Sequence, residues 1–405
     1  MALLFRTGRD NGAMDVDLAL IGFGGATSLL LSALDRHGVR GLRIAVVDPG
    51  ERGMRTWAFW TGSEDPLDAV LDAAWPRVDL HGRGGLRRLD LAPMRYAMVR
   101  SDPVYELAAE AAQRLGVRFL EASAQGLFDN GTGVSVHDSA GTEIVRARWA
   151  LDSRPAAPVR AGRTFWLQHF RGWWVEADHD AFDPASAILM DFRTPQPARG
   201  VSFGYVLPTG PRHALIEYTE FSPERLSDSG YDSALSAYIL MLGLKGLRVT
   251  RVEDGAIPMT DAPFLRRPSP RVVRLGTAGG ATRPSTGYTF SAMRRQADQI
   301  AAALLAGSDP VPAAPYPRRH LWMDSVALRA WDRGLVAAPE FFERLFTRND
   351  PVRVLRFLDG LTSPAQELAL MASTPLLPMT RAALGDLAAR TQRNRTVSAA
   401  IRPSR

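Results

Sequence analysis

Cysteine is absent from this chain of 405 residues. Its absence excludes disulfide bonds, thiolate metal sites and a cysteine nucleophile. Long apolar runs are absent too: no stretch approaches the roughly 20 residues that a helix needs to cross a bilayer, and the N-terminus lacks the apolar segment of a signal peptide. We therefore expect a cytoplasmic protein that does not cross the membrane, with residues 1–15 as a disordered lead.

Lysine is almost absent, so arginine carries most of the positive charge behind the formal net charge of +6. Such a bias often reflects GC-rich coding, and no helix-turn-helix, zinc-finger or aromatic–basic RNA motif accompanies it. We expect no nucleic-acid partner. Two interpretations of the charge remain open: peripheral attraction to anionic lipid on the inner face of the membrane, and a simply soluble surface.

Common hydrolase motifs are also missing. The sequence has neither the Gly-x-Ser-x-Gly of a nucleophile elbow nor the His-Glu-x-x-His of a zinc protease. Its seven histidines are scattered, which is typical of surface or hydrogen-bonded histidines rather than of metal ligands. We therefore predict no metal site.

The most informative segment that is present lies near the N-terminus. Residues 17–27 read Asp-Leu-Ala-Leu-Ile-Gly-Phe-Gly-Gly-Ala-Thr, and residues 44–48 read Ile-Ala-Val-Val-Asp. This pattern predicts a strand, a glycine turn, a helix and a second strand that ends in an acid, which is the unit that binds a dinucleotide. The helix amides face the pyrophosphate. The predicted contacts are Gly22, Gly24, Gly25, Ala26, Thr27 (where a third glycine is usual) and Asp48, which accepts from a ribose.

A second glycine-rich turn occupies residues 276–288, between a strand at 271–275 and a long helix. Two backbone cradles from distant segments suit a long cofactor, which favours FAD over NAD. The candidate contacts in this turn are Thr277, Gly279, Gly280, Gly287 and Tyr288.

The order of the segments predicts a mixed α/β (α+β) fold. A Rossmann-type FAD-binding domain would comprise residues 16–160 and 271–312. Residues 161–270, rich in aromatics and short alternating stretches, would form an inserted antiparallel β-sheet domain that binds substrate. Residues 313–390 have the pattern of a helical C-terminal region, and residues 391–405 form a basic tail.

Short motifs lie along nearly the whole chain. Besides both turns they occupy residues 55–60 (Arg-Thr-Trp-Ala-Phe-Trp), 168–172, 189–192, 203–208, 215–219 (Leu-Ile-Glu-Tyr-Thr), 255–259, 284–288 and 356–360. In order and spacing they resemble the flavoprotein lycopene cyclases of carotenoid synthesis, within the larger group of FAD-dependent monooxygenase-like folds. Ordinary flavin hydroxylases have Gly-Asp at the second turn, whereas this chain has Gly276-Thr277.

The resemblance implies cyclisation of the linear ends of lycopene to β-ionone rings, without net redox change. An acid protonates the terminal double bond, the neighbouring double bond attacks the cation to close a ring, and a proton is lost. This needs a carboxylic acid kept protonated in an apolar site. By its motif Glu217 is the implied acid, with Glu220 as reserve; without the family, a salt-bridged carboxylate would be equally open. The resemblance also implies FAD in its reduced form, with NAD(P)H as electron source.

Aromatic residues are candidates for the substrate pocket, because their faces stabilise cations. Core packing is the competing interpretation for each of them, and Arg55 is either a flavin contact or a solvated arginine. The pocket candidates are Trp57, Phe59, Trp60, Phe203 and Tyr205, with Tyr288 beside them.

Other functions stay open. A hydroxylase, halogenase or polyprenyl reductase could use the same scaffold, although Thr277 and Glu217 argue against it; a cyclase of another polyprenyl substrate and a non-catalytic isoprenoid carrier are further alternatives. Residues 234–247 are either a contact with the membrane or a core helix. The number of substrate ends cyclised, the ring type and the oligomeric state are left undetermined.

Overall fold

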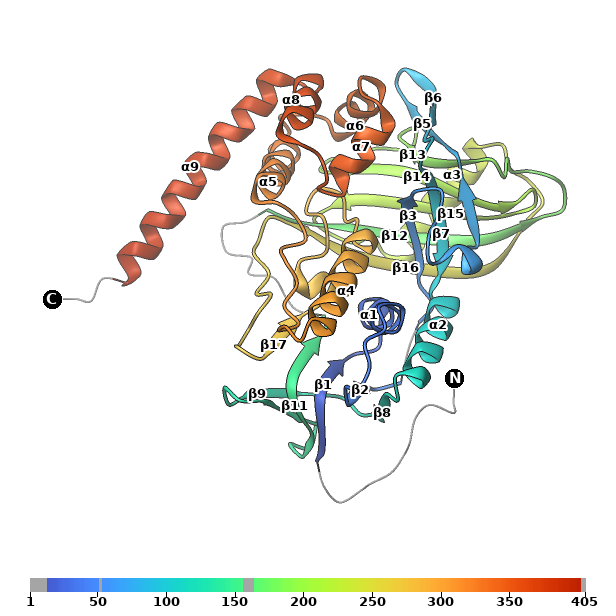
Figure 1. Cartoon of the computed structure of the whole chain (residues 1–405). Coiled ribbons are helices and arrows are strands. Elements are labelled where there is room, and N and C mark those ends of the chain that lie inside the picture. Colours follow the sequence, from blue (N-terminus) through green and yellow to red (C-terminus); the bar gives the residue numbers. More distant parts are fainter. Residues whose placement is uncertain (1–12, 51–52, 156–163, 402–405) are drawn as a thin grey trace.

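The computed structural model describes residues 13–50, 53–155 and 164–401, and the side chains up to residue 391 (Figure 1). Residues 1–12 of the expected lead, and the expected domain boundary at residue 160, lie outside the described residues. β1 (Met14–Ile21) begins inside the range expected for the lead.

The first sheet carries the predicted dinucleotide unit. β1 lies in its middle, because the apolar run that ends the strand suits burial on both faces. The strands on its parallel side are β8 (Arg118–Glu121), β2 (Ile44–Asp48), β1, β11 (Glu143–Asp152) and β17 (Val272–Arg274), and antiparallel β10 (Val134–His137) and β9 (Gly126–Asp129) complete the sheet.

Three helices pack together against one face of this sheet. α1 (Gly25–Arg36) lies between α2 (Ser101–Arg114) and α4 (Phe290–Leu305) and contacts both of them. Their buried leucines and alanines form one hydrophobic cluster with side chains of β1 and β2. α4 follows the second glycine turn, so two distant parts of the chain complete one domain, which confirms the predicted Rossmann-type architecture (Figure 1).

The second sheet is the predicted inserted sheet, and it is larger than predicted. Its strand order is β16 (Leu247–Thr260), β12 (Phe165–Ala177), β15 (His213–Ser222), β14 (Val201–Gly210), β13 (Ser186–Asp191), β5 (Arg77–Gly82) and β6 (Gly85–Asp90). All neighbours are antiparallel except β13 and β5. β5 and β6 belong to the segment expected to lie wholly in the cofactor domain; their long-range pairing leaves no local pattern in the sequence.

The two faces of the second sheet have different covers. α3 (Asp228–Met241) packs on one face, where its buried residues form a cluster with β12, β14 and β15. The other face contributes to the largest cluster of buried side chains, together with the small sheet of β3 (Thr56–Thr61), β7 (Arg95–Arg100) and β4 (Ala73–Trp75) and the C-terminal helices.

The C-terminal region is helical, as predicted. Its helices are α5 (Arg318–Asp332), α6 (Ala338–Thr347), α7 (Pro351–Leu358), α8 (Pro364–Ser373) and α9 (Leu376–Ile401). α9 projects away from the rest of the molecule and continues beyond residue 390, where a separate tail was expected to begin (Figure 1). Of the described helices, none combines the length and the apolar character required to cross a membrane.

Candidate active site

The first glycine turn joins β1 to α1. Gly22 has a φ of +85°, a conformation that favours glycine. The hydroxyl of Thr27 donates a 2.6 Å hydrogen bond to the Gly22 carbonyl, so this threonine closes the turn from the position of the usual third glycine. Asp48, which ends β2, accepts hydrogen bonds from the backbone N–H groups of Phe23 (2.7 Å) and Gly50 (2.9 Å). Asp48 therefore lies directly beside the turn.

The start of α1 has the donor set that a diphosphate requires. Gly24 is the N-cap residue, and no described side chain caps the helix. A Cβ on Gly24 would meet no atom within 4 Å, so the backbone can be approached closely there. The N–H groups of the first turn, from Gly25 to Thr27, lie at the positive end of the helix dipole. The residues present thus fit a dinucleotide phosphate.

The second glycine turn touches the first. Gly276 and Gly280 have positive φ values of +58° and +75°, and a 3₁₀ turn, η2 (Gly276–Gly279), lies between them. A Cβ on Gly276 would lie 3.2 Å from the Cβ of Ala26. The hydroxyl of Thr277 accepts a hydrogen bond from Thr282 Oγ1 (3.1 Å). The fold therefore brings the candidate cofactor residues of two distant segments together at one edge of the first sheet.

The loop after this turn leads to the second sheet. Gly287 (φ +72°) packs so closely against Gln168 of β12 that a side chain at this position would overlap it. The next residue, Tyr288, packs edge-on against Trp60 with 4.5 Å between ring centroids. This loop therefore connects the second glycine turn, to which Thr282 bonds at Thr277, with β12 of the second sheet, which Gly287 contacts at Gln168.

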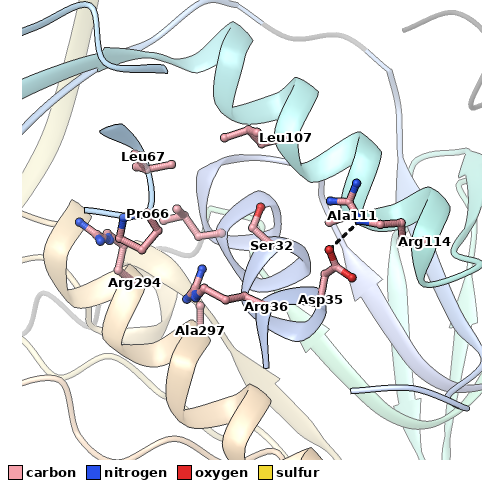
Figure 2. Close-up of a pocket in the computed structure, with 11 residues that line it drawn as sticks. Ser32, Asp35, Arg36, Pro66, Leu67, Leu107, Ala111, Arg114, Arg294 and Ala297 are labelled. Atoms are coloured by element: carbon pink, nitrogen blue, oxygen red, sulfur yellow. Dashed lines mark hydrogen bonds and ion pairs between the residues drawn. The ribbon is translucent and has the colours of Figure 1, made fainter. Parts of the chain in front are cut away.

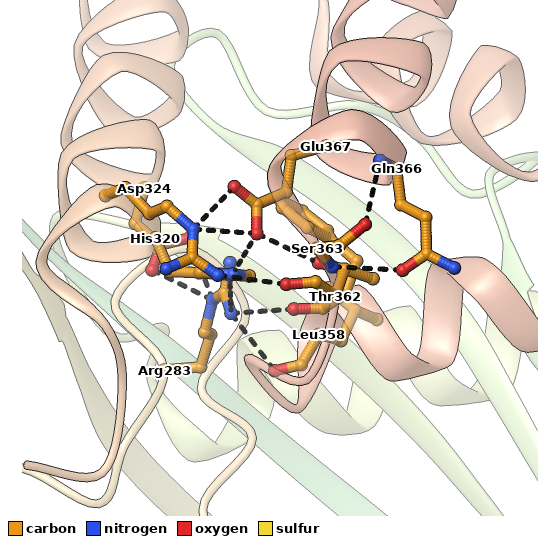
Figure 3. A network of polar contacts seen from close by, with 10 residues as sticks. Arg283, His320, Asp324, Leu358, Thr362, Ser363, Gln366 and Glu367 are labelled. Carbon is orange, nitrogen blue, oxygen red and sulfur yellow. Dashed lines mark hydrogen bonds and ion pairs between the residues drawn. The ribbon is translucent and has the colours of Figure 1, made fainter.

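A buried arginine holds this loop against the C-terminal helices (Figure 3). Arg283 is fully buried; its Nε donates to Asp324 of α5 (2.9 Å) and its Nη1 donates to the carbonyl of Phe357 in α7 (2.9 Å). Asp324 also accepts from the hydroxyl of Ser285 (2.7 Å). Burial raises the pKa of Asp324, although the guanidinium of Arg283 opposes that shift. The helical region therefore determines where the loop that carries Tyr288 lies.

A row of four residues crosses the second sheet below this loop. In register, Tyr205 of β14 pairs with Glu217 of β15, Glu217 pairs with Gly172 of β12, and Gly172 pairs with Glu253 of β16. Tyr205 shares a hydrogen bond with Tyr96 of β7. The row lies on the face that meets the small sheet and the C-terminal helices, because Tyr205 packs in that cluster.

Glu217 is a buried carboxyl, with 8% of its surface exposed. Burial is the main reason why its pKa is raised well above the ordinary value, and the nearby Glu253 raises it further. Among the described residues, no donor makes a hydrogen bond to the Glu217 carboxyl that would offset this shift. Its surroundings therefore favour the protonated form of Glu217, which is the form that a general acid in an apolar site requires.

Glu220 does not share this site. It is three residues from Glu217 on the same strand, so its side chain points to the opposite face. There it accepts a 2.8 Å hydrogen bond from Tyr218, whose ring packs in the cluster under α3. The structure therefore does not support Glu220 as a reserve acid.

Successive side chains of β3 point to opposite faces, so its three aromatic candidates fall into two groups. Trp60 faces the second sheet, near Tyr288. Trp57 and Phe59 face the helices of the first domain, where Phe290 lies 5.3 Å and 4.7 Å from their ring centroids. Trp57 and Phe59 therefore point away from the face of Trp60, because neighbouring residues of a strand point to opposite faces. Phe59, Trp60 and Tyr288 nevertheless all border one small hollow, so a shared pocket for Phe59 and Trp60 stays a prediction. Trp57 instead packs on the first glycine turn: a Cβ on Gly25 would lie 2.8 Å from its ring.

Two further candidates lie away from their predicted partners. Arg55 is exposed and donates to the carbonyl of Asp254 (3.2 Å), close to Glu253 and away from the glycine turns. Phe203 lies on the same face as Tyr205 but packs against Phe221, with 5.2 Å between ring centroids. Phe203 is therefore part of the hydrophobic core next to the row.

Two hollows in the described part of the protein are lined by residues other than those of the row. One, of about 200 Å³, lies between α1, α2 and α4 and is lined by Ser32, Asp35, Leu107 and Arg294, among others (Figure 2). Another, of about 10 Å³, is bordered by Trp60 and Tyr288, among others.

Sequence reasoning missed Gly172 and Glu253 of the row, together with Tyr96 and Arg283. Gly172 ends the motif at residues 168–172, and Glu253 stands just before the motif at residues 255–259, so a signal was present for both. Their relation to Glu217 depends on strand register, which the motifs do not specify.

Known proteins resemble this chain over most of its length. The family model described as "Lycopene cyclase protein" matches residues 17–384. The chain belongs to the lycopene cyclase family. Lycopene beta-cyclases of Pseudescherichia vulneris and of Paracoccus sp. (strain N81106 / MBIC 01143) are 27% and 29% identical to it; the matches cover 90% of this chain in both cases, and 95% and 96% of the relatives.

Solved structures confirm the fold. A geranylgeranyl bacteriochlorophyll reductase-like protein of Thermoplasma acidophilum superposes with a TM-score of 0.64 at 14% identity, covering 93% of this chain and all of that one (100%). The flavin-dependent brominase Bmp2 superposes with a TM-score of 0.59 at 15% identity, covering 89% and 98%. These likenesses show that this member of the lycopene cyclase family has the fold of known flavoenzymes.

Proposed function

We propose that the protein is a lycopene beta-cyclase that closes the linear ends of lycopene to β-ionone rings by acid catalysis, with no net redox change. The observation that carries this proposal is Glu217, a buried carboxyl with a raised pKa on the sheet face below the second glycine turn. Its relatives of similar length are lycopene beta-cyclases. A lipophilic carotenoid is the substrate that suits such an apolar, acid-bearing site.

One carboxyl group supplies the proton of the first step and takes back a proton in the last step. Glu217 donates its carboxyl proton to the terminal carbon–carbon double bond, which leaves a tertiary cation. The neighbouring double bond attacks the cation and closes the ring, and loss of a ring proton restores Glu217. The rings of Trp60 and Tyr288, close to each other above the sheet, would offer their faces to the cation. Glu217 serves both as the acid and as the acceptor of the returning proton.

FAD is the cofactor that we propose for the two touching glycine turns. The amides at the start of α1 and the carboxylate of Asp48 would hold its adenosine diphosphate half, and the turn that begins at Gly276 would hold the other half. In its reduced form, supplied with electrons by NAD(P)H, the bound flavin would provide an electron-rich ring beside the cation. Thr277 replaces the acid of ordinary flavin hydroxylases, which argues for a purpose other than hydroxylation.

Expression in lycopene-accumulating cells tests the function. We expect wild-type protein to convert lycopene to products with β-ionone rings, and the Glu217→Gln variant to leave lycopene unchanged. Lycopene that stays unchanged with folded, flavin-loaded wild type would contradict the proposal. A product with new oxygen, halogen or hydrogen would instead identify a redox flavoenzyme, and the use of another polyprenyl would identify a cyclase of different specificity.

Peripheral contact with a membrane belongs to the same proposal, because lycopene is dissolved in lipid. Of the segment 234–247, Leu235 and Tyr238 are buried under the sheet, while Leu240 is 77% exposed. α9 presents a more extended apolar surface, with Leu377 86% and Leu384 64% exposed. Arginines at residues 381 and 390 of the same helix suit anionic headgroups. We therefore favour α9 as the surface that contacts the inner face of the membrane.

Vesicle sedimentation distinguishes the two surfaces. We expect the protein to sediment with vesicles of mixed zwitterionic and anionic phospholipid. Leu377→Ser combined with Leu384→Ser should release it, whereas Leu240→Ser combined with Met241→Ser on α3 is the matched control. Loss of sedimentation in the α3 variant alone would transfer the contact to that helix, and no sedimentation of the wild type would exclude both.

A further inference from the structure

Gly172 leaves a gap between two buried carboxyl groups. It pairs in register with Glu217 on one side and with Glu253 on the other, and neighbouring strands lie about 4.8 Å apart, so the three residues form a short row. A Cβ on Gly172 would lie 2.8 Å from Cγ and 3.2 Å from Oε1 of Glu217. The side chain of Glu217 therefore leans over the glycine towards Glu253, where any larger residue would block it.

The two carboxyls differ in their hydrogen bonds. Glu253 Oε2 accepts from the hydroxyl of Thr56 (2.7 Å) and from the indole N–H of Trp174 (3.2 Å). Burial raises the pKa of Glu253, while these two donors and the charges of Arg251 and Arg55 lower it. Glu217 has no such donor among the described residues. When the pair holds one proton, the proton therefore belongs on Glu217 and the negative charge on Glu253.

Apart from Glu253, the titratable groups of the described residues around Glu217 are neutral phenols. From β14, β7 and the loop after the second turn, the titratable groups are the phenols of Tyr205, Tyr96 and Tyr288. Burial raises the pKa of all three, to about 12 for Tyr288, so they are neutral at neutral pH. The cations Arg55 and Arg251 act on Glu253. The charge that bears on Glu217 is thus that of Glu253.

We propose that Glu217 and Glu253 act as a pair across Gly172, in which the ionised carboxylate of Glu253 is a positioning group that keeps the catalytic proton on Glu217. After Glu217 has protonated the polyene, two carboxylates lie near the cation, and their attraction to it offsets their mutual repulsion. When the ring proton returns to Glu217, the singly protonated pair is restored. The kinetic part of this inference rests on the proposed function.

The pH dependence of cyclisation tests the pair. Glu253→Gln keeps the size and the hydrogen-bond acceptor of the side chain but removes its charge, so the pKa of Glu217 should fall. We expect the alkaline limb of the pH–rate profile to move to lower pH by at least about one unit. Glu253→Asp keeps the negative charge, so the alkaline limb of its pH–rate profile should stay close to that of the wild type. Glu176→Gln is the control, because Glu176 lies on the adjoining strand β12 and pairs with Arg248 at the surface.

Infrared titration of the flavin-loaded protein tests the same pair without any turnover. The wild type should show a protonated carboxyl band that Glu217→Gln abolishes, and in Glu253→Gln this band should disappear at lower pH. If Glu253→Gln does not fold, Gly172→Ala provides a second test, because its methyl group lies between the carboxyls and should shift the band in the same direction. A folded variant with an unchanged band and an unchanged limb would overturn the pair. Wild type without cyclase activity would contradict the proposed function alone, since the titration remains measurable.

Discussion

A buried glutamate lies on each face of the sheet at β12 and β15, but the hydrogen bonds around the two glutamates differ. On the face under α3, His169 bonds to Ser222 (2.7 Å) and Tyr231 (2.6 Å), and Glu220 accepts from Tyr218 (2.8 Å). On the other face, Glu217 is equally buried but has no described donor. On the α3 face these side chains are hydrogen-bonded to one another. On the other face burial raises the pKa of Glu217 and favours its protonated form, as the proposed acid chemistry requires.

Substitution of each glutamate by glutamine should produce the largest difference between the two faces, measured as the cyclisation rate. Glu217→Gln removes the transferable proton and should lower the cyclisation rate at least about 100-fold. At low pH, where Glu217 is protonated in both the folded and the unfolded state, the thermal midpoint of this variant should change little. Glu220→Gln, on the other face, should keep the rate within about tenfold of the wild type while altering the hydrogen bond of Tyr218. Rates on lycopene in lipid dispersion, with equal flavin content, measure both, and equal losses of rate would break the distinction between the faces.

His169 on the α3 face and Glu217 on the other face should respond to pH with opposite signs, while the raised pKa of Glu220 gives it the same sign as Glu217. Burial lowers the pKa of His169 from 6.5 to about 4, so the unfolded state binds a proton that the folded state does not. Stability from this residue is present above pH 6.5 and is lost as the pH falls towards 4, by up to roughly 3 kcal/mol. The pKa of Glu217 is raised, so its contribution is present at low pH and is lost as the pH rises through the folded pKa. His169→Gln should flatten the acid side of the stability profile, and Glu217→Gln the alkaline side.

Denaturant unfolding across this pH range measures both slopes. His320, whose pKa burial also lowers to about 4, contributes a slope of the same sign as His169 and remains in the His169→Gln variant. An unchanged acid slope in that variant would show that His169 does not titrate differently on folding.

Alanine substitution of two glycines on opposite faces should produce the smallest difference between the faces. A Cβ on Gly204 would overlap the buried ring of Tyr238 on α3, so Gly204→Ala should destabilise the fold by about 1–3 kcal/mol and leave the pH–rate profile of folded protein in place. Gly172→Ala should alter the profile instead, since its methyl group meets Glu217. Unfolding free energies and pH–rate profiles of the two variants check this, and a reversed pattern would contradict the assignment of the faces.

Local patterns in the sequence predicted the cofactor unit well. The strand, the turn at Gly22 and the acid at Asp48 are local features, since a glycine turn and an apolar run depend on residues next to each other. The same reasoning did not foresee that Trp57 and Phe59 point away from the face of Trp60, or Glu220 away from that of Glu217, because it grouped residues by nearness along the chain and ignored the alternation of a strand. The contribution of β5 and β6 to the second sheet left no local signal at all.

The sequence by itself thus determined the fold class and the two glycine turns, because these follow from residue types at short spacing, whereas Glu217 became the candidate acid only through the resemblance to the lycopene cyclases. Only the tertiary structure decided that the two turns touch at Ala26 and Gly276, that Arg283 ties the Tyr288 loop to the C-terminal helices, and that Glu253 faces Glu217. These relations depend on strand register and domain packing between segments far apart in the chain. Burial, which raises the pKa of Glu217, is likewise a property of the assembled fold.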